Sequence, residues 1–297
     1  MKSSKDNLIA FGAGLVAALM TLALSLYSPI TLFLAYFIPL PFFIAALIYG
    51  TSGTIIATII GTFLVGLFYG IPVAIGFLII NACPALWFAM RNISNEYQKN
   101  IGLVISEISI AGIILFLIST LPFFSDNILY FVEYFNNQLI NNFDSKISIP
   151  SMILNLLPSI IIASWIAIIA LNLMISKKLS KISKIYKLKG LTLNTNEFIY
   201  TSLPNWIIYL FLILLTTSVV LNDIASIWAK SLVVILSVPI TLQGLASIQF
   251  NINKFTMSNF LTGLFYIIVL FIPFILAIIA AIGVLDHFYD FRKLKNK

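Results

Sequence analysis

Residues 53–71 read GTIIATIIGTFLVGLFYGI, a run of apolar and small residues without a single charge. As a helix rising ~1.5 Å per residue, this run is long enough to span most of a hydrocarbon core about 30 Å thick. Eight similar stretches follow one another almost without interruption. They fall near residues 8–27, 29–50, 73–90, 101–121, 150–175, 202–221, 230–250 and 258–285. The sequence therefore predicts an all-α, polytopic integral membrane protein with eight or nine transmembrane helices.

The composition is that of a membrane protein. Hydrophobic residues make up 61% of the 297 residues and charged residues only 9%, far from the balance of a soluble domain. The apolar runs lack the alternation of outer-membrane barrel strands, and helices satisfy their own backbone hydrogen bonds in lipid. The single cysteine, Cys83, lies within an apolar run, so no disulfide framework is expected.

The net charge of +7 comes mostly from short loops beside the apolar stretches, so the expected partner is the lipid bilayer and not nucleic acid. Loop 176–200 carries six lysines against one acidic residue, Glu197, and the positive-inside rule places it in the cytoplasm. Counting back along the chain puts the acidic loop 122–149 outside and the N-terminus inside. We therefore expect a multi-pass membrane protein whose N-terminus is cytoplasmic and whose residues 1–176 form a core of six helices. An uncleaved first span is favoured over a signal peptide.

In the C-terminal third, the number of apolar stretches conflicts with the charge of the tail. Nine crossings would leave the basic tail after Arg292 outside, against the positive-inside rule. Either the tail is an exception, or one of the last three stretches enters the membrane without crossing it, which leaves eight crossings. The stretch 230–250 is the main candidate, because Pro239, Gln243 and Gly244 suit a bent helix packed within protein.

Two segments between apolar stretches are predicted to lie along the membrane surfaces. Residues 123–143 repeat apolar side chains at spacings of three and four, which predicts an outer interfacial helix. A lid over an outward-facing cavity is the alternative. Residues 177–200 form a basic cytoplasmic linker, which leads to the C-terminal membrane helices of residues 201–297.

Small residues recur every four positions in the first stretch. Ala10, Gly14 and Ala18 form one row, and Ala13 and Ala17 form another. Because four residues are just over one helical turn, each row makes a flat stripe that another helix can approach closely. The stripe serves either packing within this chain or docking to a separate membrane subunit.

Polar residues inside the apolar stretches are candidates for a binding site. Asn81 and Asn155 are expected in the outer half of the membrane, each near a proline that frees a backbone carbonyl. With Ser159 and Trp165 they would line an outward-open pocket for a small organic ligand; alternatively, each asparagine bonds a neighbouring helix. Glu107 is a candidate proton or cation site, or else a structural acid near the inner face.

Signals for catalysis are poor. His287 is the only histidine, so a histidine-based triad or a multi-histidine metal site is not expected. The sequence has no Walker-type phosphate-binding loop. No enzyme activity, metal or cofactor is therefore predicted, and any ATP-driven role would require a separate ATPase.

Short motifs, in order along the chain, resemble the YybS-like family of predicted bacterial membrane proteins, a family of unknown function. The N-terminal half contributes Pro39-Leu40-Pro41, Tyr49-Gly50-Thr51-Ser52-Gly53, Gly66, Gly70 and Pro84-Ala85. The C-terminal half contributes Leu203-Pro204-Asn205-Trp206, Gln243-Gly244-Leu245-Ala246 and Gly283-Val284-Leu285-Asp286, followed by Phe291-Arg292.

The first six helices are also similar to the substrate-binding S subunits of energy-coupling-factor transporters. Those subunits dock on a membrane coupling subunit through an Ala-x-x-x-Ala stripe, whose spacing Ala13 and Ala17 match. The resemblance implies small-molecule binding or transport in the bacterial inner membrane, with the ligand near the outer face. Residues 202–297 depart from this pattern by adding helices. Because the six-helix core is also similar to that of cell-shape scaffold proteins, the alternative function is a scaffold for envelope partners without transport.

Overall fold

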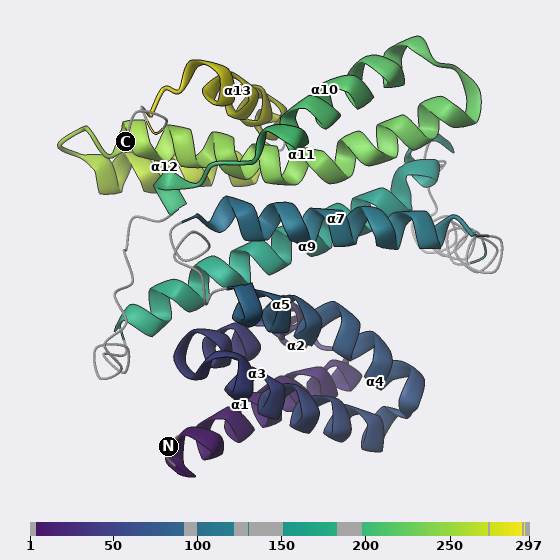
Figure 1. The fold of residues 1–297 in the computed structure, drawn as a ribbon, viewed down its shortest axis with the longest axis vertical. Coiled ribbons are helices and arrows are strands. Elements are labelled where there is room, and N and C mark those ends of the chain that lie inside the picture. The colour runs from purple at the N-terminus through teal and green to yellow at the C-terminus, as the bar shows by residue number, and fades with distance from the viewer. Residues whose placement is uncertain are drawn as a thin grey trace. The chain divides into compact units, whose positions relative to one another are not determined.

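The computed structural model describes residues 4–91, 100–121, 130, 151–182, 198–272, 274–292 and 294 (Figure 1). Within these ranges the regular structure is helical and no strand occurs, which confirms the predicted all-α class for this part of the chain. In the described part of the chain, six helical runs are long and apolar enough to cross a membrane. They are Asn7–Leu26, Pro29–Tyr69, Ile71–Arg91, Ile101–Ser119, Asn155–Ser180 and Ala225–Ile252.

The chain forms two compact units. Unit 1 consists of Met1–Val104 and Ala167–Phe198, and unit 2 consists of Ile105–Ile166 and Ile199–Lys297. Helix α9 (Ser151–Ile182) therefore contributes its first half to unit 2 and its second half to unit 1. The predicted division of the chain at the linker 177–200 stays a prediction, because most of that linker lies outside the described residues.

Unit 1 begins with a series of helices joined by tight turns. They are α1 (Ser4–Ala23), the 3-10 turn η1 (Leu24–Leu26), α2 (Pro29–Ala35), α3 (Leu40–Tyr69), α4 (Ile71–Phe77), the π-helical turn η2 (Leu78–Ala82) and α5 (Cys83–Arg91). Helix α2 starts at a capping box. The Ser28 hydroxyl accepts from the Thr31 N–H, and the Thr31 hydroxyl accepts from the Ser28 N–H.

The run Pro29–Tyr69, 41 residues long, folds back on itself at Gly50. Gly50 has φ +63° and ψ −158°, a backbone conformation that glycine adopts at little cost. A Cβ added to Gly61 would lie 3.2 Å from the Phe42 ring, although one straight helix would place these two residues ~28 Å apart. The stretches expected at 29–50 and 53–71 are therefore two antiparallel segments.

A second reversal occurs at Gly70, which has φ +84°. Across this turn a Cβ on Gly66 would lie 3.3 Å from Ala74, so α4 runs antiparallel to the second half of α3. Helix α1 runs parallel to the same half of α3, because successive residues of α1 contact successive residues of α3. Gly14 contacts the backbone of Ala57, and the Tyr69 hydroxyl donates to the Leu22 carbonyl at 3.1 Å.

The α1–α3 contact gives a direct test of close packing. A Cβ on Gly14 would overlap the carbonyl oxygen of Ala57, whereas a Cβ on Gly12, on the same helix, meets nothing within 4 Å. We expect Gly14→Ala to lower the free energy of unfolding in detergent by ~1–3 kcal/mol, the usual loss from overpacking. Gly12→Ala should not lower it. Equal unfolding curves for the two variants would contradict this contact.

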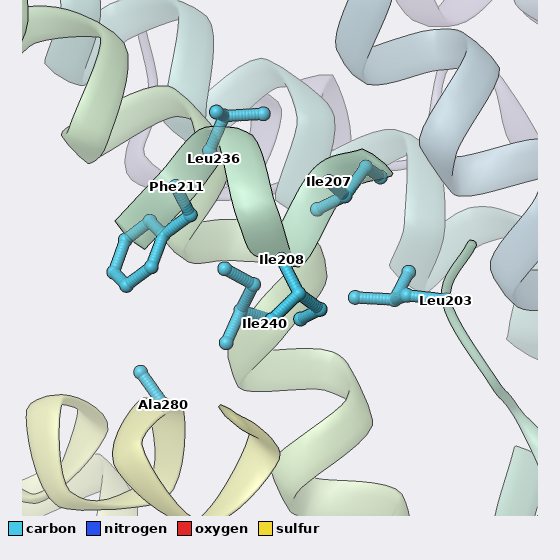
Figure 2. Packing of buried hydrophobic residues seen from close by; sticks show 7 residues of the cluster. All are labelled: Leu203, Ile207, Ile208, Phe211, Leu236, Ile240 and Ala280. Carbon is cyan, nitrogen blue, oxygen red and sulfur yellow. The ribbon is translucent and has the colours of Figure 1, made fainter. Parts of the chain in front are cut away.

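Unit 2 contains an antiparallel hairpin of α10 (Asn205–Val220) and α11 (Asp223–Ile252). Near its turn the Ser226 hydroxyl donates to the Ser218 carbonyl at 3.1 Å. At its open end the Leu203 N–H donates to Gln243 Oε1 at 3.0 Å. Side chains from α10, α11 and α13 (Ile275–Tyr289), together with Leu203 just before α10, form the apolar core of this region (Figure 2). They are Leu203, Ile207, Ile208, Phe211, Leu236, Ile240 and Ala280.

The C-terminal stretches differ from expectation. The stretch 230–250, the expected site of an interruption, lies inside the continuous 30-residue helix α11, which accommodates Pro239 in its interior. The stretch 258–285, expected as one helix, is divided into α12 (Ser258–Phe271) and α13. At ~21–22 Å, each of these two helices is shorter than a ~30 Å hydrocarbon core.

Some expectations fall on residues that the structure does not describe. The predicted interfacial helix at 123–143 is one of these, apart from Tyr130. The lysines of the linker beyond residue 182 are another. Both stay predictions.

Candidate functional site

The structure places the four predicted pocket residues in two units. Asn81 is half-buried in the π-helical turn η2 of unit 1, while Asn155, Ser159 and Trp165 lie on α9 in unit 2. Asn155 is exposed and Trp165 is half-buried. The buried Ser159 hydroxyl donates to the Leu156 carbonyl of its own helix at 2.7 Å. A pocket shared by these residues stays a prediction.

The other predicted sites are also located. Glu107 is half-buried on α7 (Ile101–Ser119), and its role as a proton or cation site stays a prediction. Of the small-residue stripe, Ala10, Gly14, Ala17 and Ala18 are buried and Ala13 is half-buried. Packing within the chain occupies Ala10 and Gly14, and docking to a separate subunit stays a prediction. In the described part of the chain, no three histidine, cysteine or acidic side chains gather to hold a metal ion.

A break in a membrane helix brings a buried amide into unit 1. The chain turns at residues 36–39, between α2 and α3. Asn172 on α9, fully buried, donates from Nδ2 to the Tyr36 carbonyl at 2.7 Å and to the Ile168 carbonyl at 2.8 Å. Its Oδ1 is also buried and accepts no hydrogen bond from the described residues. Sequence analysis did not single out Asn172.

Two hydroxyl groups on α3 also have buried oxygens without a hydrogen-bond partner among the described residues. Thr54, Thr58 and Thr62 recur every four residues and therefore share one face of the helix. The Thr54 hydroxyl donates to the Gly50 carbonyl at 2.9 Å. The Oγ1 atoms of Thr58 and Thr62 are buried without a partner among the described residues. A buried polar atom left unpaired costs ~1–3 kcal/mol, so each of these atoms requires an explanation.

The irregular segments of unit 1 converge on one aromatic contact. Phe42, just after the break at 36–39, packs edge-on against Phe77, just before η2, with ring centroids 5.7 Å apart. Both rings contact the position of Gly61, at 3.2 and 3.3 Å from a Cβ placed there. Thr58 precedes Gly61 by about one helical turn, and Thr62 is the next residue. The unpaired hydroxyls on α3 therefore flank the point where the broken helix and the π-helical turn meet.

Unit 2 holds a second polar cluster, but in this one the carboxylate is fully paired. Asp286 and Arg292 are only 3% and 4% exposed. Arg292 donates to Asp286 Oδ2 from Nη2 at 2.6 Å and from Nε at 3.0 Å. Ser247 donates to Asp286 Oδ1 at 3.1 Å, and Gln243 donates to Oδ2 at 3.3 Å.

The same cluster links three separate parts of unit 2. Arg292 Nη1 donates to the Ile199 carbonyl at 2.7 Å. Gln243 Nε2 donates to the Gly283 carbonyl at 3.2 Å, while its Oε1 accepts from Leu203. The motifs quoted from the C-terminal half of the sequence therefore meet in space. Because the polar groups of the cluster pair with one another, we interpret it as a structural lock.

Close helix contact makes this lock possible. A Cβ on Gly244 would overlap the carbonyl oxygen of Ile279, and a Cβ on Gly283 would overlap that of Ile240. After α13 the chain turns back at Asp290, which has φ 47° and accepts from the Leu294 N–H at 2.8 Å. Asp and Asn tolerate this left-handed conformation better than most residues. The turn returns Arg292 to the α11–α13 crossing.

Comparison with known proteins agrees with a membrane protein. Residues 144–287 match the model of a family described as predicted membrane protein (DUF2232). The matched range contains Asn172 and, from the lock, Gln243, Ser247 and Asp286, but it ends before Arg292. No curated protein and no solved structure matches the chain. Over just under half of its length, the chain is therefore similar to a predicted membrane protein family whose description names no activity.

Proposed function

We propose that this protein binds a small polar molecule inside unit 1, as a component of small-molecule transport across the bacterial inner membrane. The unpaired buried oxygens of Thr58, Thr62 and Asn172 carry the proposal. Because such atoms are unfavourable in a membrane interior, a ligand bearing hydroxyl or amine donors would compensate them. Asn172 Oδ1 can only accept a hydrogen bond, whereas a threonine hydroxyl can donate or accept, so the ligand class is a small polar molecule with at least one hydrogen-bond donor.

The backbone near these atoms supports the same function. In transporters, substrate sites are typically built where a membrane helix is discontinuous, and π-helical turns are frequent at functional sites. Unit 1 has both features, at residues 36–39 and at Leu78–Ala82. In this proposal the N-terminus is cytoplasmic, the protein is S-subunit-like, and a membrane coupling subunit is its candidate partner.

Valine substitutions test the proposal with little disturbance of the fold. In the double variant Thr58→Val/Thr62→Val no hydrogen bond between described residues is lost, so the melting temperature without ligand should stay the same or rise. Thr54→Val is the matched control on the same face, because the Thr54 hydroxyl is already satisfied within α3. The probe is the dialysable small-molecule fraction of a cell extract.

We expect this fraction to raise the melting temperature of the wild type and of Thr54→Val, and to leave the double variant unchanged. Asn81 is the one residue of the predicted pocket that lies in unit 1. The variant Asn81→Leu is tested in the same series, and we expect it to reduce the rise in melting temperature. An equal rise in the wild type and the double variant would overturn the assignment to these hydroxyls. No rise in any protein would favour the alternative, a membrane scaffold for envelope partners.

A further inference from the structure

In unit 2, the length of the α10–α11 hairpin can be compared with the thickness of a membrane. Its turn contains Leu221 and Asn222, and its open end is marked by the hydrogen bond between Leu203 and Gln243. Residues 203 and 222 are ~28 Å apart along a helix, which is close to the ~30 Å thickness of a hydrocarbon core. The turn and the open end therefore belong to opposite sides of the membrane.

The tip of the α12–α13 pair stays far from the hairpin turn. The Ile279 carbonyl lies against Gly244 on α11, and Phe274, at the tip, precedes Ile279 by only ~8 Å of helix. Gly244 is ~33 Å from Asn222 along α11. The tip therefore cannot reach the level of Asn222.

Both ends of the pair lie at the open end of the hairpin. At the start of α12, Gln249 Nε2 donates to Thr262 Oγ1 at 2.9 Å, beside the last turns of α11. After α13, Arg292 Nη1 donates to the carbonyl of Ile199, which lies in a 3-10 turn (Phe198–Tyr200) six residues before the first residue of α10. The buried ion pair of Arg292 with Asp286 holds this end in place.

We infer that α12 and α13 form a re-entrant helix pair, which enters and leaves the membrane on the side where the lysine-rich linker ends. Arg292 and Ile199 then share one side, and the chain crosses the membrane eight times. This arrangement removes the conflict with the positive-inside rule, because the basic tail and the basic linker lie on the same face. The Asp286–Arg292 ion pair holds the re-entrant helices against α11.

Single-cysteine labelling tests this topology. The only native cysteine is removed as Cys83→Ala, and one cysteine is introduced at a time at exposed positions of unit 2. These substitutions are Tyr200→Cys, Asn222→Cys, Phe274→Cys and Tyr289→Cys. A membrane-impermeant maleimide is then applied to vesicles of each orientation. Each variant must keep the melting temperature of its parent, and Ile272→Cys is the second choice at the tip.

We expect Tyr200→Cys and Tyr289→Cys to react from the same side, and Asn222→Cys from the opposite side. Phe274→Cys should react from neither side until detergent dissolves the membrane. Reaction of Tyr289→Cys from the side of Asn222 would show that the pair crosses once and would overturn the inference. Reaction of Phe274→Cys before detergent is added would also overturn the inference. Reaction from the Asn222 side would mean that α12 and α13 each cross the membrane fully, and reaction from the Tyr200 side would mean that the pair lies on the membrane surface.

Discussion

Replacing Arg292 with alanine is expected to lower the free energy of unfolding by ~3–5 kcal/mol, the usual loss when one member of a buried ion pair is removed. The Asp286 carboxylate, 3% exposed, would then remain buried without its cation. The substitution also removes the hydrogen bond to Ile199. Unfolding of the purified protein by SDS in mixed micelles, followed by helix content, measures the loss.

Three further variants separate charge from shape at this site. Arg292→Lys keeps the charge but not the forked geometry of the guanidinium, so an intermediate loss is expected. In Asp286→Leu/Arg292→Met the unpaired charge disappears, and much of the stability should return. Lys254→Ala, at an exposed lysine on the same unit that donates to Asn251 and lies over the Phe250 ring, should cost less than ~1 kcal/mol. A loss below ~1 kcal/mol for Arg292→Ala, within the range of exposed ion pairs, would contradict the lock.

Gly283→Val is expected to have an effect at least as large, at or above the ~3 kcal/mol upper end of typical overpacking losses. The atom that a Cβ would meet is the backbone carbonyl oxygen of Ile240. A backbone atom cannot rotate away as a side chain can, so α11 and α13 would have to separate. Their separation would also break the hydrogen bonds that Gln243 and Ser247 donate to Asp286.

Gly263→Val is the matched control, because Gly263 on α12 has nothing within 4 Å of the added Cβ. Its effect should be limited to the small difference in helix propensity, well below ~1 kcal/mol. The two variants are compared by the same SDS titration. If Gly283→Val unfolded at the same SDS fraction as Gly263→Val, the close α11–α13 crossing would be wrong.

The general class of this fold follows from sequence, but its last elements do not. Continuous apolar runs predict helices because a membrane admits few alternatives. The reversal at Gly50 falls at the last residue of the predicted stretch 29–50, just before the next stretch begins, as expected. The division of 258–285 was missed because its two halves are equally apolar, although Pro273 offered a signal. Pro239 suggested an interruption that α11 does not make, since a helix packed in protein tolerates one lost hydrogen bond.

The lock and the unpaired oxygens show what a sequence alone withholds. Gln243, Asp286 and Arg292 were noted in separate motifs, but their meeting depends on how α11 and α13 cross. The spacing of Thr54, Thr58 and Thr62 was visible, although it does not tell which hydroxyl lacks a partner. Asn172 lies in an apolar run, as Asn81 and Asn155 do, but it has no proline nearby, and its hydrogen bond to Tyr36 depends on the break between α2 and α3.

The proposal that unit 1 binds a small polar molecule is tested most directly by mass spectrometry of what co-purifies from native membranes in mild detergent. Both small molecules and proteins are identified, for the wild type, for Thr58→Val/Thr62→Val and for Thr54→Val. The account predicts one enriched small molecule with hydroxyl or amine groups in the wild type and Thr54→Val, and its loss from the double variant. Envelope-assembly proteins without any enriched small molecule, or equal enrichment in all three proteins, would contradict it.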